Sequence, residues 1–570
     1  MEGGTAYRMS LPRHTDRFTA LMARGNSLAS QARYEDAIRC YDKILAKAPG
    51  HLDAINNRGN CLSLLGRFEQ AIKSYNTILA ARPNDLRARS NRAIALKQLG
   101  RAGEALTEFD RILEIDPNSA ETLYHRGTLF SDLSRPADAV KDLRRALALD
   151  PNDGTTHSSL IFALNFDPDA TNEGLQAERA AWGARYDGLL RGVAHANEPR
   201  GDRRLRVGYV SAHFCHQAAA YAFGGVIVHH DPRQFEVICY SDTEREDGLT
   251  ERLRAHAGKW HRTRYLSDDE FCSLIRADRI DILVDLVGHM KGHRLTAFAR
   301  KPAPVQVSGW GEPTGTGLKA IDYVLADPAV IPIAERALLR EQVADLPNFI
   351  GYWSPEPLPE PSPLPARSRG YVTFGSFNRL NKILPAVRRS WAAILRAVPG
   401  SRLVLKDRLL HGSSQTEPIL AAMTDAGVAA DRVSILDQGS RAAHFAEYQG
   451  LDIALDPFPH SGGMTTLDAL AMGVPVLTLP GRTISSRLAA ASLTALGLGD
   501  YVVADAQSYM DTAIAKARDL DALAELRTSL RERLAGSAFG DPERYARAVE
   551  AQYRSMWQRW CGQQGHVTTA

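Results

Sequence analysis

One glycine- and threonine-rich segment, LDPFPHSGGMTTLDALAMGVPVLTLPG, has the residue types needed to bind a diphosphate. Its pattern predicts a strand, a loop, a helix and a second strand. Gly462 and Gly463 let the backbone approach a ligand closely, and Thr465 and Thr466 stand where the loop turns into the helix. The free N–H groups of that helix terminus suit a diphosphate, and Asp468 could accept hydrogen bonds from ribose hydroxyls. The alternative is an ordinary N-terminal cap, in which a threonine and Asp468 only stabilise the first turn.

The composition argues against several functional classes. Hydrophobic residues make up 44% of the chain and charged residues 24%, as in a soluble globular protein, and no apolar run is long enough to cross a bilayer. The first residues lack the apolar core of a secretory signal, so we expect a cytoplasmic location. Six scattered cysteines without metal-ligand spacing predict reduced thiols and no zinc site. The net charge of +3, with mixed signs along the chain, does not imply nucleic acid.

A regular repeat, with a period of about 34 residues, organises the N-terminal part of the chain. Small residues recur where two helices must touch, a large apolar residue acts as a wedge, and a proline ends each unit. This is the tetratricopeptide signature, and it predicts about four clear repeats, an α-superhelix, over residues 1–160. The four series are Gly25, Gly59, Ala93 and Gly127; Ala37, Ala71, Ala105 and Ala139; Tyr41, Tyr75, Phe109 and Leu143; and Pro49, Pro83, Pro117 and Pro151.

Polar residues share the register of these repeats. Asn57 and Asn91 occupy the same position in successive repeats, so an asparagine ladder could hold an extended peptide by its backbone. Alternatively, these side chains bridge neighbouring repeats. The arginines in the same register are Arg24, Arg58, Arg92 and Arg126.

Beyond the repeats, the pattern changes to α/β. Short runs rich in Val and Ile, such as LRVGYVS and IDILVDLVGH, alternate with helix-length segments and predict mainly parallel sheets. Prolines at every second position from Pro355 to Pro365 exclude helix and central strand and predict a stiff spacer. The spacer therefore predicts two lobes with a cleft between them. We expect a helical connector at 161–202 that caps the repeats, a Rossmann-like lobe at 203–354, the linker at 355–369, a second Rossmann-like lobe at 370–540, and a C-terminal helix at 541–570 that packs back onto the first lobe.

Several segments in both lobes resemble the catalytic domain of O-GlcNAc transferases and the related protein O-fucosyltransferases. They include RVGYVSAHF, ILVDLVGHMKGHRLTAFARKPAPVQVSGWGEPTGTG, FGSFNRLNKILPAV and PGRTISSRLAAASLTALG. The resemblance implies a GT-B fold and inverting transfer of GlcNAc from UDP-GlcNAc to Ser or Thr of proteins. It also implies that no metal or other cofactor is needed and that the repeats recruit the acceptor protein. The short array points to a bacterial member of the family.

Without a metal, a protein cation must neutralise the leaving diphosphate. Lys382, in FNRLNK, matches the family lysine that contacts the diphosphate; the alternative is a surface lysine that opens the helix KILPAVRRSW. Asn378 and Arg379 precede it and are candidates for contacts with the phosphates or the sugar. Two Asp-x-Asp matches lie away from the expected cleft, Asp167 with Asp169 and Asp519 with Asp521.

The acceptor side departs from the family pattern. Where the family has Asp-Phe-x-x-His, this chain has HFCHQ, and ungapped alignment places Gln217 on the histidine. His216 lies one residue early, and His213 begins the motif; histidine is a residue type suited to act as a base near neutral pH, or both are polar loop residues. Asp247, in REDGLT, matches a family aspartate proposed to assist proton removal through water. Its alternative is a turn-forming Asp-Gly.

The segment LDQGSRAAHFAEYQGLD resembles the stretch that cradles the uracil. The resemblance implies backbone contacts from Gln438 and Gly439 and a side-chain contact from Arg441. It also implies that His444 stacks on the base or pairs with its edge. The alternative for His444 is a histidine on a helix surface.

Other positions match the family less closely. Glu447 replaces an arginine of animal members, and Gly463 and Met464 stand where those have His and Thr. Phosphate and sugar contacts are therefore expected to differ. Pro313, in GEPTGTG, matches a sugar contact, and Lys406 ends a strand on the side of the cleft as a further candidate ligand.

Two other functions remain open at the level of sequence. One is a protein O-fucosyltransferase that uses GDP-fucose, because both subfamilies share the repeats and the lysine. The other is an inactive scaffold in which only the repeats act. The acceptor protein, the acceptor-side base and the oligomeric state are not specified by the sequence.

Overall fold

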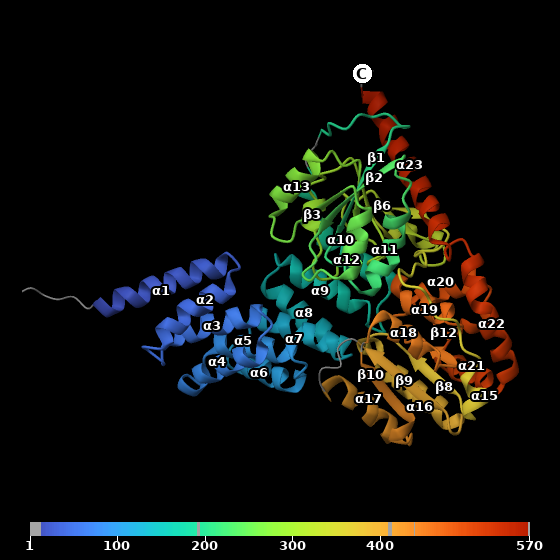
Figure 1. The fold of residues 1–570 in the computed structure, drawn as a ribbon, viewed down its shortest axis with the longest axis horizontal. Coiled ribbons are helices and arrows are strands. Elements are labelled where there is room, and N and C mark those ends of the chain that lie inside the picture. The colour runs from blue at the N-terminus through green and yellow to red at the C-terminus, as the bar shows by residue number, and fades with distance from the viewer. Residues whose placement is uncertain (1–12, 191–193, 408–412, 438, 568–570) are drawn as a thin grey trace, which may run out of the picture. The chain divides into compact units, whose positions relative to one another are not determined.

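The computed structural model describes residues 13–190, 194–407, 413–437 and 439–567, and the chain divides into two compact units (Figure 1). The first unit contains the described residues up to Leu129, Arg145–Pro151 and the start of α17. The second contains Phe130–Arg144 and, from Asn152 onward, the remaining described residues.

The first unit is built from tetratricopeptide helices, as the repeat period predicts. A Cβ atom added to Gly25 would lie 2.6 Å from the ring of Tyr41, and one added to Gly59 would lie 2.8 Å from Tyr75. Small residues are therefore required where the aromatic wedges pack. The helices of the repeats are α1 (Arg13–Ser30), α2 (Tyr34–Leu45), α3 (Leu52–Leu64), α4 (Phe68–Ala81), α5 (Leu86–Gln98), α6 (Ala102–Ile115), α7 (Ala120–Asp132) and α8 (Pro136–Leu149).

The polar ladder of the repeats bridges neighbouring helices. Asn57 Nδ2 donates to Asn26 Oδ1 at 2.9 Å, and Asn91 Nδ2 donates to Asn60 Oδ1 at 3.0 Å. Both bonds connect one repeat with the preceding one, which is the second of the two alternatives considered for these side chains. Arginines of the same register form ion pairs with the preceding helix, Arg58 with Asp42 and Arg126 with Asp110.

The first Rossmann-like lobe, within the second unit, has a seven-stranded parallel sheet in the order β3-β2-β1-β4-β5-β6-β7. The order reverses direction between β1 and β4, and ligands of such sheets bind beyond the carboxyl ends of the strands at this switch point. The strands are β1 (Leu205–Ser211), β2 (Phe235–Ser241), β3 (Lys259–Arg262), β4 (Ile282–Asp285), β5 (Val305–Ser308), β6 (Tyr323–Ala326) and β7 (Gln342–Asp345). Its helices are α11 (Ala218–His229), α12 (Gly248–His256), α13 (Asp268–Ala277) and α14 (Leu295–Phe298).

The connector is part of the first lobe's core. Its helices α9 (Gly154–Leu164) and α10 (Asn172–Ala184) are followed by the short turn η1 (Asp187–Leu189). Ile161 and Trp182 are fully buried in one apolar cluster with Ile238 and Leu283 of the sheet. The connector was expected to cap the repeats, whereas its apolar residues are buried against this lobe.

The second lobe has a five-stranded parallel sheet in the order β10-β9-β8-β11-β12, with its switch point between β8 and β11. The two-lobed α/β fold predicted from the sequence is confirmed. The strands are β8 (Thr373–Ser376), β9 (Arg402–Asp407), β10 (Val433–Asp437), β11 (Ile453–Leu455) and β12 (Val476–Leu477). The helices are α16 (Pro385–Ala397), α17 (Ser413–Asp425), α18 (Arg441–Tyr448), α19 (Met464–Ala471), α20 (Leu488–Ala495), α21 (Ala506–Arg518) and α22 (Leu520–Gly536).

Two further segments complete the second unit. The proline-rich run differs from expectation at its end, where Pro365 begins the short helix α15 (Pro365–Arg369). Proline is tolerated at the first helical position because its missing N–H would have no helical partner there. The last helix, α23 (Pro542–Val567), packs against α11 of the first lobe, and Tyr553 Oη lies 3.2 Å from Tyr209 Oη.

Within the part of the chain that the structure describes, no helix is long and apolar enough to cross a bilayer. Four of the six cysteines are buried, Cys40, Cys61, Cys239 and Cys272.

Candidate active site

Lys382 lies at the switch point of the second sheet. It stands on the short turn η3 (Leu380–Lys382) after β8, and α16 begins three residues later. Its Nζ donates to the carbonyl oxygen of Ser461 at 2.7 Å and to Asn378 Oδ1 at 3.4 Å. The amine therefore reaches across to the loop after β11. Burial lowers the pKa of Lys382 to about 8, although the nearby Asp456 carboxylate opposes that shift.

Asp456 fixes the loop that faces this lysine. The carboxylate is buried at the end of β11 and accepts from the Gly462 backbone N–H and from Thr478 Oγ1, each at 2.7 Å. Burial raises its pKa to about 6, opposed by these hydrogen bonds and by Lys382. A Cβ atom at Gly462 would lie between 2.7 and 2.9 Å from Thr465, Thr466 and Asp456. Only glycine therefore fits this close approach.

The first turn of α19 carries no side-chain cap from the described residues. Gly463 occupies the N-cap position, so neither threonine acts as the cap proposed in the alternative interpretation. Thr465 Oγ1 donates to Asn378 Oδ1 at 3.1 Å. Thr466 Oγ1 is buried and has no hydrogen-bond partner among the described residues. The helix that begins at Met464 thus keeps its N-terminal dipole uncapped, and the exposed Arg379 adds positive charge at the same strand end.

Arg441, His444 and Asp468 form one charged cluster between α18 and α19. The guanidinium makes two hydrogen bonds to the buried Asp468 carboxylate, at 2.8 and 2.6 Å, and His444 Nε2 lies 3.4 Å from Asp468 Oδ2. Burial raises the pKa of Asp468, but these two partners outweigh it and lower the pKa overall. The carboxylate expected to face a ribose is therefore engaged by Arg441.

The neighbouring predicted ligands have different surroundings. The His444 ring lies 5.6 Å from that of Phe377 and 5.1 Å from that of Tyr448. Lys406 is buried and forms an ion pair with Glu447, the residue that replaces an arginine of animal members. Gly439 is exposed ahead of α18, and Gln438 lies outside the described residues.

The acceptor-side candidates follow β1 of the first sheet. The His216 backbone N–H donates to Asp247 Oδ2 at 2.7 Å, and its Nδ1 lies 2.7 Å from Tyr221 Oη. Asp247 also accepts from Leu249 and Thr250 N–H in a capping box at the start of α12. The structure therefore brings His216 and Asp247 together, with the aspartate acting as a helix cap. His213 stands earlier in the loop, and its backbone N–H donates to the Ser211 hydroxyl at 2.9 Å.

The loop GEPTGTG, which includes the buried Pro313, is held by the connector. Glu312 accepts from Arg179 Nη2 and from Asn165 Nδ2, each at 3.1 Å. Asn165 Oδ1 in turn accepts from Ser485 Oγ of the second lobe at 3.2 Å. This buried network joins the connector to loops of both lobes.

Among the described residues, no cluster of three or more His, Cys, Asp or Glu side chains could bind a metal. Of the Asp-x-Asp pairs, Asp167 accepts from the backbone N–H of Asp169, whereas Asp519 caps α22 and Asp521 pairs with Arg367.

Comparison with known proteins identifies the family to which these lobes belong. Residues 192–354 and 364–549 match glycosyl transferase family 41. The chain belongs to this family. Tetratricopeptide repeats match at 22–85, 62–120 and 120–153.

Two plant proteins and one solved structure illustrate the similarity of this chain to other proteins. A tomato protein (Solanum lycopersicum) named probable UDP-N-acetylglucosamine–peptide N-acetylglucosaminyltransferase SPINDLY is 35% identical over 408 residues, 70% of this chain and 44% of its own. The probable transferase SEC of Arabidopsis thaliana is 30% identical over 376 residues, 64% of this chain and 38% of its own. The chain thus spans less than half the length of these relatives. A lysine-to-methionine variant of the Thermobaculum terrenum O-GlcNAc transferase matches with a TM-score of 0.83 at 34% identity, over 90% of this chain and 98% of that structure.

Three side chains around the candidate site were not among the sequence predictions. Asp456 ends a buried strand in LDPF, and a charged residue in that position was an available signal. No local signal marked Tyr221 or Glu312, because Arg441, which contacts the Tyr221 ring, and Arg179, which donates to Glu312, lie far away in the sequence.

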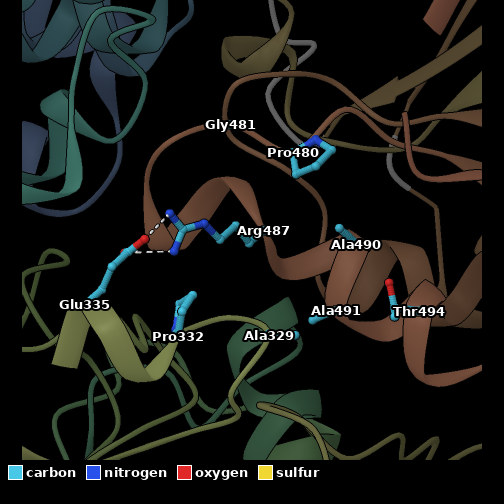
Figure 2. Close-up of a pocket in the computed structure, with 9 residues that line it drawn as sticks. All are labelled: Ala329, Pro332, Glu335, Pro480, Gly481, Arg487, Ala490, Ala491 and Thr494. Atoms are coloured by element: carbon cyan, nitrogen blue, oxygen red, sulfur yellow. Dashed lines mark hydrogen bonds and ion pairs between the residues drawn. The ribbon is translucent and has the colours of Figure 1, made fainter. Parts of the chain in front are cut away.

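A cavity of about 450 Å³ also lies between the two lobes (Figure 2). Two of its lining residues, Glu335 and Arg487, form an ion pair, with Nη2 2.7 Å from Oε1. None of the predicted site residues lines it. Its lining residues are Ala329, Pro332, Glu335, Pro480, Gly481, Arg487, Ala490, Ala491 and Thr494.

Proposed function

We propose that this chain transfers GlcNAc from UDP-GlcNAc to Ser or Thr hydroxyls of proteins, with inversion and without a metal. The observation that carries the proposal is the half-buried amine of Lys382 at the β8 end, 2.7 Å from the carbonyl of Ser461 in the loop that leads into α19. The names of the family 41 relatives supply the sugar and the acceptor class.

Lys382 and the N-terminus of α19 receive the leaving diphosphate. When the acceptor oxygen bonds to C1 of the sugar, the C1–O bond to the phosphate breaks and UDP leaves with the electron pair. The Lys382 ammonium and the uncapped N–H groups of α19 lie where that charge collects. Asn378 and Arg379 precede the lysine and contact the phosphates or the sugar.

Nucleotide and sugar contacts come from the loops around this position. Arg441, His444 and Asp468 form the side of the pocket that binds the base and ribose, and Gln438 and Gly439 contribute backbone groups. Asp468 reaches the ribose only if Arg441 yields part of its hydrogen bonding. The sugar lies against Gly462, Gly463, Met464, Thr465, Thr466 and Pro313.

His216 is the base that removes the acceptor proton. Its backbone is held by Asp247 and its ring by a tyrosine hydroxyl, so its orientation is fixed. His213 and a water held by Asp247 are the competing assignments. The tetratricopeptide repeats present the acceptor protein.

Isothermal titration with UDP, GDP and UDP-GlcNAc, together with transfer of labelled GlcNAc to a Ser/Thr peptide library, tests the proposal. We expect UDP and UDP-GlcNAc to bind, GDP to bind much more weakly, and label to enter the peptides. Preference for GDP would instead support a fucosyltransferase, and binding of none of the three would support an inactive scaffold. His216→Gln should lower turnover without weakening UDP binding, with His213→Gln as the matched comparison.

A further inference from the structure

Tyr221 is the residue that contacts both the donor-side and the acceptor-side groups. It lies in the first turn of α11 in the first lobe and is 5% exposed. Its hydroxyl oxygen is 2.7 Å from His216 Nδ1. The guanidinium carbon of Arg441, from the second lobe, lies 4.2 Å from the centre of its ring.

We propose that Tyr221 is a positioning residue that couples the two halves of the active site: its hydroxyl orients His216, and its ring holds Arg441. The inference rests on the proposed function, because it deepens the roles given there to these two residues. The two contacts use different parts of one side chain, so they can be separated by substitution.

The hydroxyl contact determines which nitrogen of His216 faces the acceptor. Burial raises the pKa of Tyr221, so the phenol stays neutral. With the Nδ1–H donating to Tyr221 Oη, the lone pair remains on Nε2, where a base needs it. A neutral oxygen in that position also stabilises the imidazolium formed when the proton is taken up.

The charges around this contact come from four different elements. Asp247 precedes α12, Glu356 lies in the proline-rich segment, and Arg441 and Asp468 come from α18 and α19. Arg441 lowers the pKa of Tyr221, whereas the three carboxylates raise it. The pKa of the Tyr221 hydroxyl therefore depends on charged groups from both sides of the site.

The ring contact holds the cation of the nucleotide cluster. Arg441 contacts two rings, with its guanidinium carbon 4.2 Å from the centre of Tyr221 and 4.3 Å from that of Phe445. A guanidinium over an aromatic face is attracted by the ring's quadrupole, and the attraction is stronger where water is excluded. The fork that Arg441 presents to Asp468 is thereby fixed from the opposite lobe.

Tyr221→Phe and Tyr221→Leu separate the two roles. The phenylalanine variant keeps the ring and should bind UDP like the wild type, but its kcat should fall on the order of tenfold or more, because general bases contribute roughly 10²–10⁴-fold. The acidic limb of its pH profile should move to lower pH, since the imidazolium loses its acceptor. The leucine variant should show the same loss and also bind UDP about tenfold more weakly.

Tyr501→Phe is the matched control. Tyr501 is a buried tyrosine with a cation, Lys516 Nζ, 4.7 Å from its ring centre. Among the described residues, it makes no hydrogen bond or ring contact with a proposed site residue. Loss of the Tyr501 hydroxyl should change neither UDP affinity nor the pH profile. Unfolding midpoints of all three variants confirm that each is folded.

Two readouts test the inference even if the proposed function fails. NMR of 15N-histidine protein, with the His216 signal assigned by His216→Gln, should show the Nδ1–H tautomer in the wild type and loss of that preference in Tyr221→Phe. UDP titration reports the ring contact without any turnover. An unchanged tautomer in Tyr221→Phe, or equal UDP affinity in the phenylalanine and leucine variants, would overturn the proposal. Absence of GlcNAc transfer by the wild type would instead refute the proposed function.

Discussion

Loss of the Lys382 charge should slow transfer strongly, whether the charge is removed by substitution or by pH. In the proposed mechanism, Lys382→Met deletes the cation beside the leaving diphosphate. Removing one preorganised group of this kind typically costs roughly 2.7–4 kcal/mol of barrier, which is about 10²–10³ in kcat. UDP-GlcNAc affinity should fall less than kcat, because the negative charge on the phosphate increases as the C1–O bond breaks.

The pH dependence follows from the burial of the amine. With a pKa of about 8, ammonium exceeds free amine by about tenfold at pH 7 and is about tenfold scarcer at pH 9. The profile of kcat/KM, which reports the free enzyme, should therefore fall above about pH 8. The profile of kcat should fall at higher pH, since bound diphosphate stabilises the ammonium.

Steady-state kinetics between pH 6 and 10 provide the assay, with Lys382→Arg as the control. Arginine stays protonated throughout this range, so that variant should lose the basic limb while it retains part of the activity. A wild-type kcat/KM that is level up to pH 10, or a methionine variant with undiminished kcat, would refute the role given to Lys382.

Three further predictions concern the loop and the core. Gly462→Ala should abolish UDP binding measured by titration, because the added Cβ would lie within 2.9 Å of three neighbouring side chains. Gly499→Ala is the control and should bind UDP normally, because a Cβ there would have nothing within 4 Å. Normal binding by both variants would contradict the packing argument. Asp456→Asn replaces one acceptor oxygen with a donor and should lower the unfolding free energy by about 1–3 kcal/mol in urea titrations, and an unchanged midpoint would show that the carboxylate does not hold the loop. Burial lowers the pKa of His293 to about 4, so its imidazole stays neutral in the folded protein, whereas in the unfolded chain it takes up a proton below about pH 6.5. The unfolding free energy should therefore fall from pH 6.5 towards pH 4, by up to about 1.4 kcal/mol per pH unit for this group. His293→Gln should reduce that slope, but the exposed His256→Gln should not.

The repeats and the two sheets could be predicted because their signals are local. Each tetratricopeptide unit repeats the packing of the one before it, so a glycine and its aromatic wedge, such as Gly59 and Tyr75, recur at a constant spacing. Buried parallel strands are likewise short apolar runs that stand out from amphipathic helices. The positions of the site loops could also be predicted, because a strand that is recognised in the sequence shows where it ends, as before His213 and Asn378.

The remaining features depend on contacts between distant segments. Nothing in the sequence around Tyr221 indicates that Arg441, from the other lobe, lies over its ring. The connector presents apolar residues that suit either the repeats or the first lobe, and only the complete core decides between them. Asp468 could be predicted as a buried carboxylate, but its pairing with Arg441 requires α18 and α19 to be placed together.

The HFCHQ segment can be reconciled with a working acceptor site by the way its backbone is held. The family pattern would place the base one residue later, at Gln217, which instead lies at the N-cap of α11 without a capping hydrogen bond. Asp247 binds the backbone N–H of His216, and Tyr221, one turn into α11, binds its ring. Because both contacts converge on the same histidine, a shift of one residue in the sequence need not displace the base by the same amount in space. Position along the chain is therefore a weaker guide to the proposed base, His216, than the two contacts that hold it.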